Sequence, residues 1–227
     1  MTPGGSPTEL FLPWRAVATV LDGAEPAGSV RLPGGSDNQV FLRTGDAVMI
    51  VSRNEPGPET TALSGTPRVT NLWEQNVPTE SAAAETTFDV GSVPVIVTGL
   101  HRETAAWELA FKVEPAQLSE VFGAPQTLTL IVRNTFDRPV QGKLTIVAPP
   151  DWTLRPSMID VSLGYKEELR LPVEVTLPPG GETQDALLRI EHDMAADRRR
   201  QFSVYRSIRI GDGEVRLEVD TRIVDNT

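Results

Sequence analysis

Residues 128–134 read LTLIVRN, and residues 166–175 read KEELRLPVEV. In both stretches apolar side chains alternate with polar ones, at Leu128, Leu130 and Val132 and again at Leu169, Leu171, Val173 and Val175. Successive side chains of a strand point to opposite faces, so a period of two predicts strands with one buried and one solvated face. The chain is therefore expected to fold around antiparallel β-sheets.

Strand patterns continue through the second half of the chain. Spacing of about 8–12 residues, with turn residues between the strands, is typical of an antiparallel sandwich. Trp152, flanked by the residues PPD, is the expected large core side chain of this half. The further strands expected here are 142–148, 152–156, 185–192, 201–210 and 214–219.

The first half shows the same alternation from residue 28 onward. Expected strands are 28–32, 40–43, 47–52, 68–73, 85–90, 93–98 and 107–113, separated by loop segments such as PGGSDN and EPGPETT. Residues 114–125 have the composition of a linker. We therefore expect an all-β chain of two antiparallel, immunoglobulin-like β-sandwich modules in series, with domains at 1–115 and 116–227.

One short helix is expected before the first strand. Pro13 suits the first helical position, Gly23 suits the end, and apolar residues follow at i, i+3, i+4 and i+7 as Trp14, Val17, Ala18 and Leu21. About three turns are too few for a helix to persist alone in water. We expect its apolar stripe to pack on the first sandwich.

Two stretches resemble known families. LPWRAVATVLDGAEPAGSVRL, FLRTGDAVMIVSRNEP, RVTNLWEQNVPT and FDVGSVPVIVTGL, within residues 12–100, resemble the last barrel helix and the C-terminal β-sandwich of bacterial retaining (β/α)8 glycoside hydrolases. The chain departs from that pattern at Ser52, where a Trp is common, and at Glu74-Gln75, where a Gly is usual.

LTLIVRNTFDRPVQGKLTIVAPPDWTLRP, within residues 118–210, resembles the NEW3-type immunoglobulin-like domain associated with α-galactosidases. Together the resemblances imply an accessory region of a larger extracellular or periplasmic bacterial protein. No catalytic site is implied, because the barrel that would carry the two carboxylates is absent from this sequence.

Charge and composition set aside several classes of function. The net charge is −10, which disfavours nucleic acid and anionic membranes as partners. The sequence has no cysteine, which removes disulfides, thiolate zinc sites and cysteine nucleophiles. No apolar run is long enough for membrane insertion, and residues 1–10 do not have the pattern of a signal peptide.

Candidate catalytic groups are scattered. A glycosidase needs two opposed carboxylates, and the first half offers Asp37, Asp46, Glu74, Glu80, Glu85 and Asp89, mostly in turns or on solvated faces. His101 and His192 lack a neighbouring nucleophile motif and are expected at the surface. The segments 34–38 and 211–214 do not approach a calcium-loop pattern and are expected to be turns. We therefore predict no catalytic, cofactor-binding or metal-binding residue.

Binding surfaces are also weakly signalled. Trp14, Trp73, Trp107 and Trp152 lie in apolar patterns and are expected in the core, which leaves only Tyr165 and Tyr205 for stacking on sugars. The run 198–200, three arginines, is expected to be a solvated hairpin. The leading hypothesis is a non-catalytic structural and interaction module that contacts neighbouring domains of its parent protein. The alternatives are a carbohydrate-binding module and, less favoured, part of a glycoside hydrolase active unit.

Overall fold

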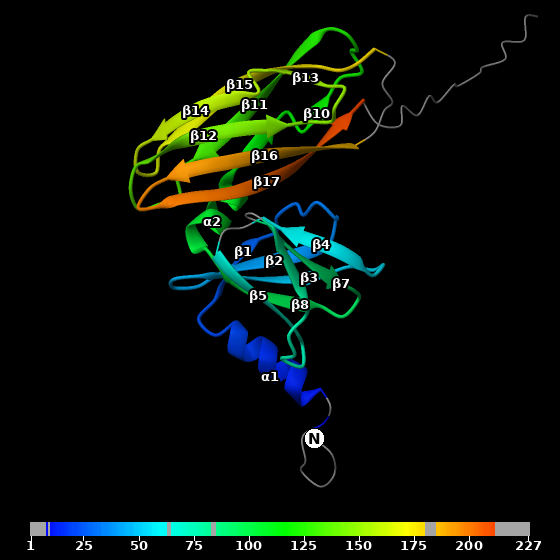
Figure 1. Cartoon of the computed structure of the whole chain (residues 1–227), viewed down its shortest axis with the longest axis vertical. Coiled ribbons are helices and arrows are strands. Elements are labelled where there is room, and N and C mark those ends of the chain that lie inside the picture. Colours follow the sequence, from blue (N-terminus) through cyan, green and yellow to red (C-terminus); the bar gives the residue numbers. More distant parts are fainter. Residues whose placement is uncertain (1–7, 9, 63–64, 83–84, 180–184, 212–227) are drawn as a thin grey trace, which may run out of the picture.

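The computed structural model describes residues 8, 10–62, 65–82, 85–179 and 185–211. The expectation of an all-β chain is confirmed: antiparallel sheets dominate, and the described part of the chain contains two helices, α1 (Phe11–Val20) and α2 (Arg102–Ala110). Two sandwiches lie one above the other along the long axis, with α2 between them and α1 at the far end of the first (Figure 1). The expected strand at 214–219 lies outside the described residues.

The first sandwich joins a five-stranded sheet, in the order β1-β2-β3-β8-β5, to a three-stranded sheet, β4-β7-β6. Its core includes Val40, Met49 and Val97 from the larger sheet and Phe88 from the smaller one. The strands are β1 (Glu25–Gly28), β2 (Asp37–Leu42), β3 (Ala47–Ser52), β4 (Gly57–Thr61), β5 (Gly65–Asn71), β6 (Thr79–Ala82), β7 (Glu85–Val90) and β8 (Val95–Leu100).

The second sandwich joins the sheet β10-β17-β16-β12-β14 to the sheet β13-β15-β11-β9. The two stretches that predicted the fold pair with one another, as β11 and β15, with Leu130 opposite Leu171. The strands are β9 (Lys112–Glu114), β10 (Gln117–Leu118), β11 (Pro125–Arg133), β12 (Val140–Val147), β13 (Thr153–Arg155), β14 (Met158–Leu163), β15 (Glu168–Thr176), β16 (Asp185–Ala195) and β17 (Arg199–Ile210).

Four local expectations are wrong. The expected strand 28–32 is displaced, because β1 ends at Gly28 and residues 29–32 lie outside the named strands. Residues 107–110 belong to α2 and not to a strand. The expected linker contains β10, which pairs in parallel with β17, and its first residue, Glu114, is the last residue of β9, which pairs with β11. The expected loop EPGPETT contains all of β4, where the carboxylate of Glu59 accepts hydrogen bonds from the backbone N–H groups of Gly34, Ser36 and Thr60. The boundary at residues 115 and 116 stays a prediction, although the pairing of β9 places residues 112–114 in the second sandwich.

Helix α1 forms where the sequence predicts it, but its packing differs from the expectation. Ala16 is its one buried residue, and Trp14 is 69% exposed. Arg43 donates a hydrogen bond to the carbonyl of Val20 at 3.0 Å, and Arg15 forms an ion pair with Glu74 at 3.2 Å. Polar contacts therefore fix α1 to the sandwich. Of its apolar stripe, Trp14 and Ala18 are exposed, whereas Val17 and Leu21 are half-buried. Neither described helix is long and apolar enough to span a bilayer.

Candidate functional site

Helix α2 belongs to both hydrophobic cores. Ala105 is buried in the first core and Leu109 packs against it, whereas Trp107 and Phe111 are buried in the second. Residues four apart lie on the same face of a helix, so each pair forms one face and the two faces look toward different sandwiches. This double burial makes α2 a structural part of both sandwiches and not a flexible tether.

Two arginines of β17 hold the two ends of α2. Near its C-terminus, Arg206 donates to the carbonyl oxygens of Phe111, at 2.8 Å, and of Glu108. The last carbonyls of a helix have no partner within it, and a cation there also suits the helix dipole. Near the N-terminus of α2, Arg200 donates through Nε and Nη2 to Nε2 of His101, at 3.3 and 3.1 Å.

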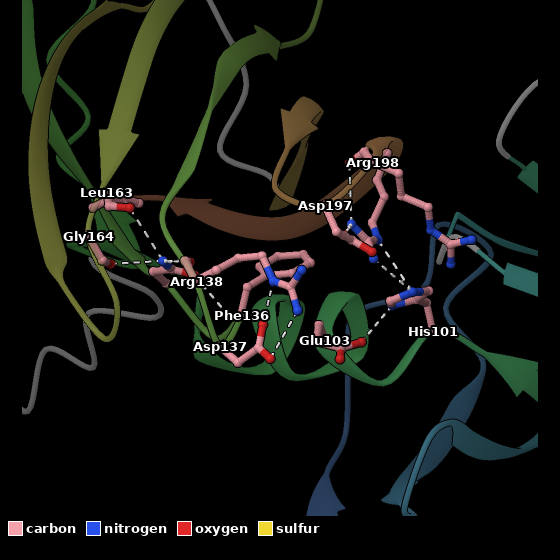
Figure 2. Close-up of polar contacts among 11 residues, drawn as sticks. His101, Glu103, Phe136, Asp137, Arg138, Leu163, Gly164, Asp197 and Arg198 are labelled. Carbon is pink, nitrogen blue, oxygen red and sulfur yellow. Dashed lines mark hydrogen bonds and ion pairs between the residues drawn. The ribbon is translucent and has the colours of Figure 1, made fainter.

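His101 is the centre of a charged cluster (Figure 2). Because Nε2 accepts hydrogen bonds from Arg200, Nδ1 carries the ring proton, and Nδ1 lies 2.8 Å from Oε2 of Glu103. That contact has the distance of an ion pair without the alignment of a hydrogen bond. Burial, and then the charge of Arg200, lower the pKa of His101, so the ring is neutral near pH 7.

Arg200 corrects the expectation of a solvated arginine run. It is 7% exposed, forms an ion pair with Asp197, and places its guanidinium 5.1 Å from the centre of the Phe136 ring. Arg198 and Arg199 are exposed, as expected. A buried guanidinium needs partners for its N–H groups, and the hairpin and His101 supply them. We refer to α2, His101, Arg200 and Arg206 as the α2 junction.

The outer face of β17 adds contacts between the sandwiches. The hydroxyl of Tyr205 donates to Glu85 of β7 at 3.1 Å, and burial followed by the charge of Glu85 raises the pKa of Tyr205 to about 12. Arg31 donates to the hydroxyl of Ser207 at 3.0 Å. Arg189 of β16 forms an ion pair with Glu85 at 3.2 Å. The junction is thus extended by polar contacts from two separate segments of the first sandwich, which carry Arg31 and Glu85.

The buried groups Glu108 and His192 lie close to the junction. Burial raises the pKa of Glu108 to about 8, against the opposing effect of Arg206. His192 corrects the expectation of a surface histidine: it is 2% exposed and stacks on Phe202, with ring centres 4.6 Å apart. Burial lowers its pKa to about 3, so the ring is neutral and serves the core.

The candidate carboxylates do not form a catalytic pair. Asp37, Glu74, Glu80 and Asp89 are exposed, and Asp46 forms an ion pair with Arg43. Glu85 does lie near a second carboxylate, Glu191, in a cavity of about 480 Å³ between the sandwiches. The same Nη2 of Arg189 lies 3.2 Å from Glu85 and 3.1 Å from Glu191. A guanidinium therefore occupies the space between these carboxylates, where a hydrolase would hold its substrate.

Metal ligands and the two turn segments give no further site. Among the described residues, no three His, Cys, Asp or Glu side chains gather as a metal site would require. Segment 34–38 leads into β2 and is held by Glu59. Residues 212–214 lie outside the described part of the chain.

The four tryptophans divide into two groups, which corrects the expectation that all are buried. Trp107 is 1% exposed, and Trp152 packs, partly buried, at the edge of the second core, where it lines a cavity with Leu177 and Ile210. Trp14 and Trp73 are 69% and 47% exposed. The Arg15–Glu74 ion pair joins the residues next to them. We refer to Trp14, Arg15, Trp73 and Glu74 as the Trp14–Trp73 surface.

The loop that carries Trp73 is tightly held. Oδ1 of Asn71 accepts hydrogen bonds from the N–H groups of Trp73, at 2.9 Å, and of Gln75, at 3.0 Å. The N–H of Asn71 donates to the carbonyl of Gln75, and its side-chain amide donates to the Gln75 side chain. Glu74 has a φ of 63°, a left-handed conformation that costs a non-glycine residue on the order of 1 kcal/mol. The hydrogen bonds of Asn71 therefore fix the backbone at Trp73, whose side chain is exposed.

Comparisons with known proteins leave function open. No family model matches the sequence, and no curated protein matches it. Structural likenesses include WR4, a C. elegans MSP family member (TM-score 0.29, 11% identity, 44% of this chain and 94% of that one). Another is a PapD-like domain of human CEP192 (TM-score 0.31, 13% identity, 46% of this chain and 87% of that one). A third is Bacteroides uniformis beta-glucuronidase (TM-score 0.29, 14% identity, 73% of this chain and 26% of that one). TM-scores this low carry no argument about function.

Proposed function

We propose that this chain is a non-catalytic structural and interaction module that holds neighbouring domains of a larger protein in a fixed relative orientation. The observation that carries the proposal is the α2 junction, in which one helix is buried in both cores and held at both ends by β17. A flexible linker would leave the sandwiches free to reorient, which is the usual expectation for weakly contacting domains. Here reorientation would have to expose Trp107 or Ala105.

The parent protein that we propose is a carbohydrate-active protein of the bacterial exterior or periplasm. This part of the proposal rests on the resemblance of residues 12–100 and 118–210 to accessory regions of such proteins. The open reading frame that encodes this chain tests it directly. An adjoining (β/α)8 barrel would support the proposal, and a frame that encodes this chain with no further domain would contradict it.

Rigidity can be measured because the sequence has no cysteine. Spin labels at Asp89→Cys and Glu174→Cys, two exposed strand positions in different sandwiches, report one distance across the junction. We expect a single narrow distance distribution by pulsed electron paramagnetic resonance. A broad distribution in the unaltered background would refute the proposal.

Substitutions in the β17 hairpin locate the source of the rigidity. Arg200→Ala removes the contact with His101 and should broaden the distribution, because the N-terminal end of α2 loses its partner. Arg199→Ala is the matched control, since Arg199 is exposed and pairs with Asp193 of the same hairpin. Equal distributions in the two variants would mean that Arg200 does not fix the orientation.

A further inference from the structure

The Trp14–Trp73 surface is unusual for a protein surface in two respects. Two large aromatic side chains are exposed on separate segments that an ion pair brings together. One of them stands on a loop held by five hydrogen bonds of Asn71 and strained at Glu74. Ordering an exposed Trp in this way lowers the entropy lost when something binds to it.

Charge and polarity select the kind of ligand. The core of a protein–protein interface is depleted of charged residues, whereas here Arg15 and Glu74 join the two tryptophan-bearing segments with side chains 49% and 53% exposed. An ion pair with free donor and acceptor capacity suits a ligand rich in hydroxyl groups, and indole faces suit the C–H faces of pyranose rings. The net charge of −10 disfavours an anionic ligand.

We infer that Trp14 and Trp73, together with the adjacent ion pair of Arg15 and Glu74, bind a neutral polysaccharide through ring stacking and hydroxyl hydrogen bonds. The site is an open surface at the α1 end of the first sandwich, which suits an extended chain better than a small molecule. It is remote from the α2 junction and independent of the rigidity proposed above. Binding here would add a ligand-recognition function to a module proposed as a spacer.

Native affinity electrophoresis tests the inference with five neutral probes: hydroxyethyl cellulose, xylan, laminarin, galactomannan and starch. We expect at least one probe to retard the full chain. Trp73→Ala and Trp14→Ala should each weaken that retardation at least about tenfold, the loss usual for a central aromatic anchor. Tyr165→Ala is the matched control, because Tyr165 is 57% exposed and lies in the other sandwich.

Both tryptophans are exposed, so the variants should fold, and circular dichroism with urea unfolding checks that they do. Absence of retardation by all five probes would overturn the inference, as would retardation that survives the double substitution. Sedimentation velocity tests the rival occupant, a second protein surface that would cover Leu10 and Leu12 as well. Self-association that the double variant abolishes, without retardation by any probe, would assign the surface to protein contact and overturn the sugar site.

Discussion

Replacing Glu108 with glutamine should stabilise this protein at neutral pH and should do so more strongly as the pH rises. Glu108 is 3% exposed, and burial raises its pKa from 4.5 to about 8. Between these two values the native state retains a proton that the unfolded chain has released. Native stability therefore falls as the pH rises through this window, because the unfolded state binds fewer protons.

The size of the effect follows from the two pKa values. Between pH 4.5 and pH 7, a group with these pKa values lowers the free energy of unfolding by about 3 kcal/mol. Glutamine has nearly the same shape as the protonated acid and has no proton to lose, so the variant escapes this loss. Arg206 is the cation that faces Glu108, and burial lowers the pKa of Arg206 as well. Arg206 still caps α2 in the variant.

Urea unfolding of both proteins at several pH values between 4.5 and 7 measures the difference directly. The free energy of unfolding of Glu108→Gln minus that of the parent should grow by about 3 kcal/mol across this range. The comparison cancels the pH dependence of all other groups. A difference that stays constant with pH would refute the reasoning, since it would mean that Glu108 is ionised in the native state.

Three further predictions concern the junction and the absence of catalysis. Trp107→Ala should lower the free energy of unfolding, measured in urea, by about 3–5 kcal/mol, because it leaves a cavity in the second core. Trp152 is only partly buried, so Trp152→Ala should lower it less; equal losses would contradict this order. A fragment of residues 116–227 should show no fixed near-ultraviolet circular dichroism, whereas a fragment of residues 101–227, which retains Trp107 and Phe111, should fold; a stable shorter fragment would show that α2 is dispensable. The full chain should not hydrolyse aryl glycosides between pH 4 and 8; turnover that persists on repurification and disappears in Glu191→Gln would prove the cavity beside Arg189 catalytic.

The sheets could be predicted from the sequence, and α2 could not. Period-two patterns identified β11 and β15 because each has one buried and one solvated face. Apolar residues at 107 and 109 in α2, at 111 just after it and at 113 in β9 continue the same period of two, and positions 107, 109 and 111 alternate between the two cores. A helix buried on two opposite faces by separate sheets mimics a strand in its pattern, and only the tertiary structure distinguishes the two.

The two sites were missed for different reasons. His101 and Arg200 are 99 residues apart in sequence, and no local pattern relates them. Trp14 and Trp73 were assigned to the core because large aromatic side chains usually lie there, although each also stands beside charged residues, Arg15 and Glu74. The segment NLWEQN did contain a signal, since an Asn two residues before an exposed position often forms an Asx turn.

The assignment of alternate faces of α2 to two cores constrains how the chain can vary in length. One residue inserted within α2 would turn everything after it by about 100° and carry Phe111 away from its core. Insertions of three or four residues would nearly restore the phase and would shift one sandwich relative to the other along the helix axis by about 5 Å for each turn. Related chains that keep this helix should therefore differ in its length only by whole turns, so that the offset between the sandwiches along α2 changes in discrete steps.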